Sequence, residues 1–147
     1  MDGGEIEGYR GIESSEGSTL EVNGGLIEGS EMGIFAGSSF TITGGTIIGA
    51  GNDAYGVYVT LGGNVEISDG QIKGGADKSV GFHEDQPGQP QGTITICGGM
   101  FSDKAGENRL AEDYVYFDNT DPETKTDYPF VANKLQLIDI PVGLTLT

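Results

Sequence analysis

The stretch Gly24-Gly25-Leu26-Ile27-Glu28-Gly29 decides the fold, because related units recur along the chain. These units begin at residues 3, 24, 44, 69 and 98, so successive units start 21, 20, 25 and 29 residues apart. A recurring period of twenty-odd residues is typical of a solenoid, in which each repeat is one turn of the chain. The recurring units are Gly3–Gly8, Gly24–Gly29, Gly44–Gly49, Asp69–Gly74 and Gly98–Asp103.

The unit from Gly24 to Thr43 contains three short apolar pieces, at residues 26–28, 33–35 and 39–43, with glycine- and serine-containing turns between them. The third piece, Ser39-Phe40-Thr41-Ile42-Thr43, alternates apolar and polar residues, which is the period of a half-buried strand. Pieces of this length separated by glycine are too short for useful helices. Three short strands in about twenty residues predict one coil of a β-helix.

Alignment of the units predicts columns of like residues, because successive coils stack about 4.8 Å apart. The three inward columns are Ile6, Ile27, Ile47, Ile72 and Phe101; Ile12, Ile34, Val57 and Val80; and the pairs Leu20/Val22, Phe40/Ile42, Val65/Ile67 and Ile94/Ile96. Two outward columns are Thr19, Ser39, Asn64 and Thr93, and Glu21, Thr41, Glu66 and Thr95. The second glycine of each pair is expected at a corner with positive φ, and Asp69, in the first place once, is expected to tolerate a left-handed conformation.

The pattern changes after Phe101. Residues 103–112 are predicted to form one or two helical turns, residues 114–117 a strand, residues 118–123 a turn, and residues 128–131 and 135–140 two further strands. We therefore divide the chain into β-helix coils (1–102) and a C-terminal cap (103–147) within one structural unit. Because the first repeat begins without a lead-in, we expect the chain to be a fragment of a longer protein. The lack of an N-terminal cap indicates either missing upstream sequence or an end-to-end contact.

The charge balance limits the partners. There are 23 acidic and 7 basic residues, giving a formal net charge of −16. This composition argues against nucleic acid and against an anionic membrane, because both attract positive surfaces. No stretch approaches the roughly 18 apolar residues of a membrane span, so no membrane insertion is expected. Cys97 is the only cysteine, so no intrachain disulfide can form. Neither a metal site nor a cofactor is expected.

The unit Gly44-Gly45-Thr46-Ile47-Ile48-Gly49, preceded by Thr41-Ile42-Thr43, resembles the right-handed parallel β-helix repeats of large bacterial surface proteins, many of them from Gram-positive gut organisms. The run Gly98–Ser102 followed by Leu110–Tyr114 is similar to their frequent ending. The resemblance implies an all-β, right-handed, single-stranded parallel β-helix of about four to five coils with a C-terminal cap. It also implies an extracellular or cell-wall stalk or adhesin. The partners that we expect are cell-surface glycans or other protein chains, or further copies of the chain through end-to-end or side-by-side self-association.

Parallel β-helix folds include polysaccharide lyases and hydrolases, so carboxylates near the corners are candidate catalytic groups. Glycoside hydrolysis needs two carboxylates at a defined separation, and a lyase needs a basic residue to take a proton. The two arginines lie at opposite ends of the stack, and Lys73 and Lys78 are the cations that face its middle. This distribution favours solvating loop charges over a catalytic site for Asp53, Asp69, Asp77, Glu84 and Asp85.

The ligand-binding candidates are Tyr55, Tyr58 and His83. Both tyrosines belong to the second face of the coil, with Phe35 and Phe82 expected in a nearby register. Such a row of rings can stack on sugars, pack under a loop or meet another chain.

His83 is the only histidine and begins the longest insertion, His83–Gln91, where it is either an acid or base or an exposed loop residue. Cys97 falls in the outward column of Asn23, Thr43 and Ser68, which favours a small column residue over a nucleophile. No catalytic residue is predicted. The sequence favours a non-catalytic structural or adhesive module, with a carbohydrate-binding or polysaccharide-cleaving domain as the alternative.

Overall fold

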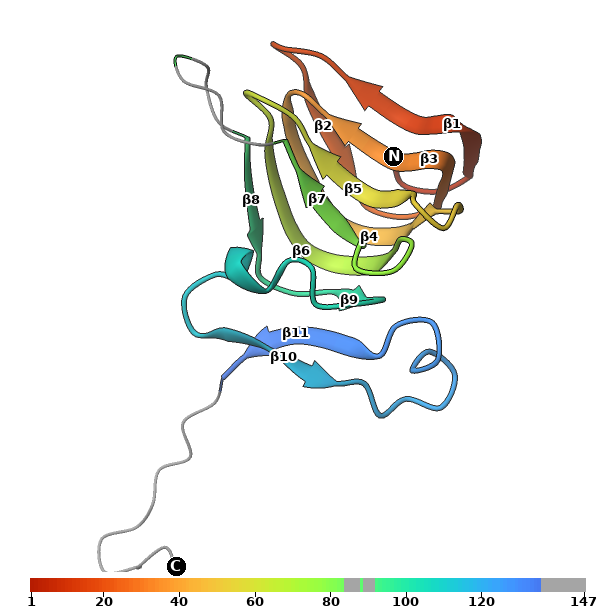
Figure 1. Cartoon of the computed structure of the whole chain (residues 1–147), viewed down its shortest axis with the longest axis vertical. Helices are drawn as coiled ribbons and strands as arrows, with labels where there is room; N and C mark the ends of the chain where they lie inside the picture. The colour runs from red at the N-terminus through yellow and green to blue at the C-terminus, as the bar shows by residue number, and fades with distance from the viewer. Residues whose placement is uncertain (84–87, 89–91, 136–147) are drawn as a thin grey trace, which may run out of the picture.

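The structure is a computed structural model that describes residues 1–83, 88 and 92–135. The described part of the chain is all-β, with one short 3-10 helix, and forms a β-solenoid of about three turns (Figure 1). The elements are β1 (Glu5–Ser14), β2 (Thr19–Val22), β3 (Leu26–Ala36), β4 (Ser39–Gly49), β5 (Tyr55–Val59), β6 (Asn64–Lys73), β7 (Val80–Phe82), β8 (Thr93–Ile96), β9 (Met100–Phe101), η1 (Glu107–Arg109), β10 (Tyr114–Asp118) and β11 (Phe130–Lys134).

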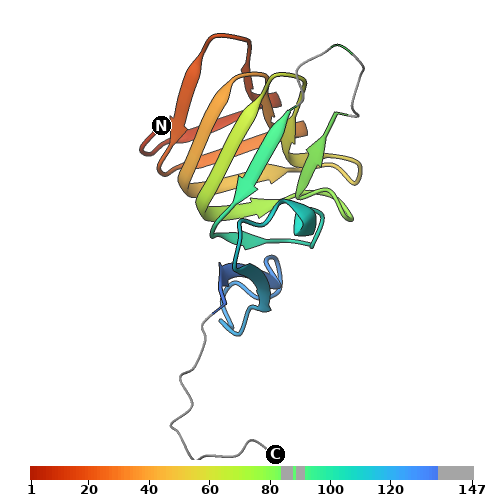
Figure 2. The same ribbon diagram turned by 90° about the vertical axis from the view of Figure 1, so that its left-hand side faces the viewer.

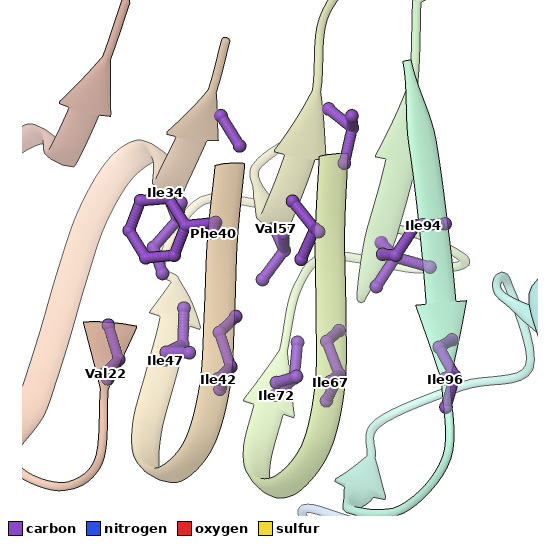
Figure 3. Packing of buried hydrophobic residues seen from close by; sticks show 14 of the residues in the cluster. Val22, Ile34, Phe40, Ile42, Ile47, Val57, Ile67, Ile72, Ile94 and Ile96 are labelled. Carbon is purple, nitrogen blue, oxygen red and sulfur yellow. The ribbon is translucent and has the colours of Figure 1, made fainter. Parts of the chain in front are cut away.

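The predicted columns are confirmed by the strand register. In the first column Ile6 pairs with Ile27, Ile27 with Ile47, Ile47 with Ile72 and Ile72 with Phe101, all in parallel strands. The other two inward columns and both outward columns also follow the predicted register. Ile27, Ile47, Ile72 and Phe101 are each 0% exposed, and Figure 3 shows the aliphatic side chains packed between the sheets. Each buried aliphatic side chain contributes roughly 1.5–3 kcal/mol, so these columns are the core of the fold.

The strands are longer than predicted, because hydrogen bonding continues around two of the corners. β1 and β3 each join the first and second predicted strands, whereas β4 and β6 each join a third strand to the first strand of the next coil. At the glycine corner, Thr46 N donates to Gly25 O at 2.9 Å, and Gly25 has a φ of 88°. The chain therefore bends at the glycine pair within one strand, and the β4–β6 register shifts there between Ile42 and Thr46. Figure 2 shows that the bends of successive coils are aligned.

Asp69 is the exception at these corners, and the expected left-handed conformation is absent there. The positive φ belongs to the following residue, Gly70, at 116°. The Asp69 side chain instead accepts a hydrogen bond from Gly70 N at 2.8 Å. The first place of the pair therefore needs no positive φ, and a carboxylate at this place satisfies a backbone donor of the corner.

The segment after β9 adds two antiparallel strands at the β9 end of the sheet. β11 pairs with β9 and β10 pairs with β11, so both extend the sheet beyond the last parallel strand (Figure 1). The predicted strand at 114–117 is confirmed as β10, but the strand predicted at 128–131 begins at Phe130, since turn hydrogen bonds continue as far as Tyr128 N. The helical turns predicted in 103–112 reduce to η1, and the strand predicted at 135–140 falls outside the described residues apart from Leu135. The boundary at residue 102 stays a prediction.

Asp103 connects this segment to the solenoid. It is 9% exposed and accepts hydrogen bonds from Ser79 N at 2.9 Å, Ser79 Oγ at 2.5 Å and Ala105 N at 2.9 Å. Ser79 is fully buried, so both partners are withdrawn from water. Removal of the carboxylate would leave buried donors unpaired, which typically costs about 1–3 kcal/mol.

Candidate functional site

The predicted aromatic residues Tyr55 and Tyr58 lie together on the outer face of β3 and β5. Phe35 and Tyr58 are register partners, and their rings stack with centroids 5.8 Å apart and planes at 14°. The Tyr55 ring lies 5.0 Å from that of Tyr58, tilted by 58°. All three residues are half-buried, so the rings form a row across neighbouring coils.

Cations lie over the rings at both ends of this row. The guanidinium carbon of Arg10 is 4.3 Å from the centroid of Phe35. At the other end, Lys78 Nζ is 4.5 Å from the Tyr55 centroid and donates a hydrogen bond to the Tyr55 hydroxyl at 3.3 Å. A cation over an aromatic face contributes roughly 0.5–2 kcal/mol, depending on its exposure. We call Arg10, Phe35, Tyr58, Tyr55 and Lys78 the ring row.

Carboxylates surround the Arg10 end of the ring row. Arg10 Nη1 is 3.0 Å from Glu13 Oε1, and Arg10 Nε is 3.6 Å from Glu31 Oε2. A side-chain hydrogen bond to Glu31, together with the charge of that residue, raises the pKa of Tyr9. Arg10 thus interacts with two acidic side chains and one ring, and the two negative charges reduce its electrostatic attraction for an anionic ligand.

The Tyr55 ring also covers Gly81. Gly81 is the register partner of Tyr58, so the row would have a gap at this position. A Cβ added to Gly81 would lie 2.3 Å from Tyr55 Cε1, which leaves no room for a side chain. Sugar stacking needs accessible ring faces, whereas the faces of this row contact Arg10, Lys78, Gly81 and one another.

The structure places the Phe82 side chain away from the ring row, on the inner face of β7. Phe82 pairs with Val59 and packs against the buried core, so its expected position beside the row is wrong. Its ring contacts Arg109, whose guanidinium carbon lies 4.2 Å from the ring centroid. Strict alternation along β7 already puts Phe82 on the same face as Val80, and this signal identifies it as inward-facing. His83 follows β7 directly, and its N–H donates to Val59 O at 2.9 Å.

The candidate carboxylates that the structure describes lie at the surface. Asp53, Asp69 and Asp77 are all exposed, whereas Glu84 and Asp85 lie outside the described residues, as does most of the His83–Gln91 insertion. Within residues 1–83, 88 and 92–135, no group of three or more His, Cys, Asp or Glu side chains is arranged to hold a metal ion.

Cys97 repeats a contact that its column neighbours make. Cys97 Sγ contacts Ile67 O at 3.4 Å, and Ser68 Oγ lies at the same distance from Ile42 O. Thr43 Oγ1 likewise lies 3.5 Å from Val22 O, one coil earlier. Burial, and then the charge of Glu66, raise the pKa of the Cys97 thiol, which lowers its thiolate content. The geometry matches a small column residue that donates to the preceding coil.

A groove that the sequence reasoning missed follows the glycine corner. Its volume is about 420 Å³, and it is lined by residues of successive coils: Gly24, Gly25, Gly44, Gly45, Thr46, Asp69, Gly70, Gln71 and Met100. Thr46 Oγ1 and Gln71 Oε1 lie 3.3 Å apart along one wall. The repeated glycine pairs were the available signal, because residues without side chains leave a depression wherever they stack.

Comparison with protein-family models, with curated proteins and with solved structures found no match for the chain. None of the described residues belongs to a helix with the length and apolar character of a membrane span.

Proposed function

We propose that the chain is a non-catalytic structural or adhesive module of a bacterial surface protein. In this proposal it is a right-handed parallel β-helix of four to five coils, capped from residue 103 and located outside the cell or on the cell wall. The observation that carries the proposal is that polar and aromatic side chains on the outer faces contact their counterparts one coil away.

These outer contacts form ladders along the stack. Asn23 Nδ2 donates to Asp2 Oδ1 at 2.8 Å, and Thr43 Oγ1 bonds to Asn23 Oδ1 one coil further on. Between β6 and β8, Thr93 Oγ1 donates to Asn64 Oδ1 at 2.7 Å. In the ring row, the contacts between neighbouring coils are made by stacked rings and by cations over the rings. Side-chain contacts between coils stabilise the stack, and a stalk requires such stability. In this proposal glycans or other protein chains bind to the outer surface of the stack.

The alternative is a carbohydrate-binding or polysaccharide-cleaving domain. The observation that favours it is the groove along the glycine corner, because the faces of the Tyr55 and Tyr58 rings are already in contact within the ring row. Thr46, Asp69 and Gln71 line this groove and carry the hydroxyl, carboxylate and amide groups that bond to sugar hydroxyls. A chain of sugars lying along the solenoid axis would pass all three side chains.

A glycan array combined with product analysis on a panel of polysaccharides separates these functions. The chain is compared with Tyr58→Ala and Gln71→Ala, and with Tyr114→Ala on β10 as a matched control remote from the ring row and the groove. We expect no polysaccharide products, and we expect Tyr58→Ala to lower stability by roughly 1–2 kcal/mol through loss of ring contacts.

Release of products by the purified chain would overturn the non-catalytic proposal. Glycan binding that is lost in Tyr58→Ala or Gln71→Ala, but retained in Tyr114→Ala, would establish the alternative.

A further inference from the structure

The outermost strand of the extended sheet, β10, has one free edge among the described residues, since it pairs there with β11 only (Figure 1). Asp113 O accepts from Leu135 N at 2.6 Å, and Asn119 N donates to Pro129 O at 2.8 Å, so the odd-numbered residues bond toward β11. Hydrogen bonding alternates along an antiparallel strand, which directs the backbone groups of Tyr116 and Asp118 to the free edge. The Tyr114 carbonyl also faces this edge, whereas its N–H donates to Ala111 O at 3.0 Å.

We propose that this edge pairs antiparallel with β10 of a second copy of the chain, around a two-fold axis at Tyr116. The Tyr116 N–H and C=O then exchange hydrogen bonds with the same groups of the second copy. Asp118 N–H donates to the Tyr114 carbonyl across the interface, in both directions. Because the two edges are identical, the contact is self-complementary and closes at a dimer.

The side chains of β10 fit this register. Centring on Tyr116 places Tyr114 opposite Asp118, Val115 opposite Phe117, and Asp113 opposite Asn119, so no carboxylate faces a carboxylate. Like charges directly opposite each other would destabilise such a pair. Phe117 is 43% exposed, and pairing covers it with Val115 of the second copy.

The edge at the opposite end of the solenoid fits a second copy less well. Among the described residues β1 pairs with β3 only, but the register of β1 shifts between Gly8 and Arg10. β1 also carries three glutamates, Glu5, Glu7 and Glu13, against a single cation, Arg10. Next to it on β2, the Glu21 carbonyl already accepts a bond from the Met1 ammonium. The free edge of β10 has a regular register, and it is therefore the better candidate for pairing with a second copy.

The dimer is expected to be weak. A five-residue strand buries far less than the roughly 1,600 Å² of a standard interface, so a dissociation constant on the order of 100 µM is expected. Each copy carries a net charge of −16, so the copies repel at low ionic strength. Added salt screens this repulsion, and dimerisation is therefore expected to strengthen as salt rises. The proposal is independent of the proposed function.

Sedimentation velocity on the full chain, from about 10 µM to about 1 mM at low and high salt, tests the dimer. Hydrogen exchange at the same concentrations tests the edge: exchange of the Tyr116 and Asp118 amides should slow as concentration rises, while exchange of the Val115 and Phe117 amides does not change.

Asp118→Pro removes the donor that faces the second copy, and a proline is tolerated on an edge strand at such a position. Asp118→Ala is the matched control, because it keeps the N–H. We expect Asp118→Pro to weaken dimerisation at least tenfold and Asp118→Ala to leave it within about twofold.

Three results would overturn the proposal. The first is a monomer at every concentration with rapidly exchanging Tyr116 and Asp118 amides. The second is a monomer in which those amides are protected, which would mean that other residues of the same chain cover the edge. The third is a dimer that Asp118→Pro does not weaken. If Asp118→Pro fails to fold, the concentration dependence of the two amides in the unmodified chain still decides the question.

Discussion

Neighbouring isoleucines on β4 offer a test of the column architecture. Ile47 is 0% exposed and stacks between Ile27 and Ile72, whereas Ile48 is half-buried and pairs with Glu28 and Lys73 on the outer face. The same substitution to alanine at these adjacent positions removes the same atoms from opposite faces of one strand. Any difference between the two variants therefore reports which face is buried.

The expected magnitudes follow from these positions. Truncation of a fully buried isoleucine to alanine typically costs 2–5 kcal/mol, because a cavity remains where the methyl and methylene groups packed. For Ile47→Ala we expect about 3–4 kcal/mol, since coils above and below hold the cavity open. For Ile48→Ala we expect about 1 kcal/mol or less, because much of its side chain already meets water. Ile47→Asp should abolish cooperative unfolding, since a carboxylate buried in the column has no partner.

Urea unfolding followed by tyrosine fluorescence and circular dichroism measures these differences. The chain has 6 tyrosines and no tryptophan, so tyrosine is the fluorescent probe. A domain of this size has a total stability of about 5–15 kcal/mol, so the expected loss in Ile47→Ala is a large shift in the midpoint. Equal losses in Ile47→Ala and Ile48→Ala, or a nearly unchanged curve for Ile47→Asp, would refute the column assignment.

Two further predictions concern the ring row and the segment after β9. Gly81→Ala should destabilise by about 1–2 kcal/mol in urea unfolding, because the new methyl group displaces the Tyr55 ring, whereas Gly3→Ala, with open space around it, should have little effect. Burial, followed by the charges of Asp103 and Glu107, raises the pKa of Tyr116. Its contribution to stability is therefore complete below the unfolded pKa of about 10 and is lost as the pH rises above it. Tyr116→Phe should make this alkaline decline in the free energy of unfolding shallower, while leaving stability at neutral pH unchanged or higher, because the hydroxyl is buried without a hydrogen-bond partner.

A specific result would contradict each of these two predictions. Were Gly81→Ala as stable as Gly3→Ala, or were its effect unchanged in a Tyr55→Ala background, the contact between the ring and Gly81 would not limit the site. An alkaline stability profile that is identical in the unmodified chain and in Tyr116→Phe would mean that the Tyr116 hydroxyl titrates alike in the folded and unfolded states.

Most of the fold was predictable because the repeating units of the sequence can be aligned with one another. Residues with one role recur at one place in each unit, so Ile27, Ile47 and Ile72 identify one another as neighbours without any long-range information. The second glycine of each pair was predictable for the same reason, and each has positive φ. Strand ends were less predictable, since apolar periodicity cannot show whether hydrogen bonds continue through a corner such as Gly44-Gly45.

The candidate site was predictable only in part. The repeat placed Phe35 and Tyr58 in register, but Lys78 and Arg10 come from other coils, and no local pattern shows that their charges end the ring row. The same applies to Asp103, whose partner Ser79 lies in an earlier coil. Contacts made by the non-repeating residues need three-dimensional information, because nothing in the spacing of the units specifies them.

The unequal lengths of the units have a mechanical consequence. Each coil is held only by the coils directly above and below it, so tension applied to the two ends would extract coils one after another from an end of the stack. Successive units start 21, 20, 25 and 29 residues apart, so the coils contain different numbers of residues. At up to about 3.5 Å per extended residue, one extracted coil lengthens the chain by roughly 70–100 Å. A force–extension trace would therefore rise in uneven steps, and the size of each step would identify the coil that had just been released.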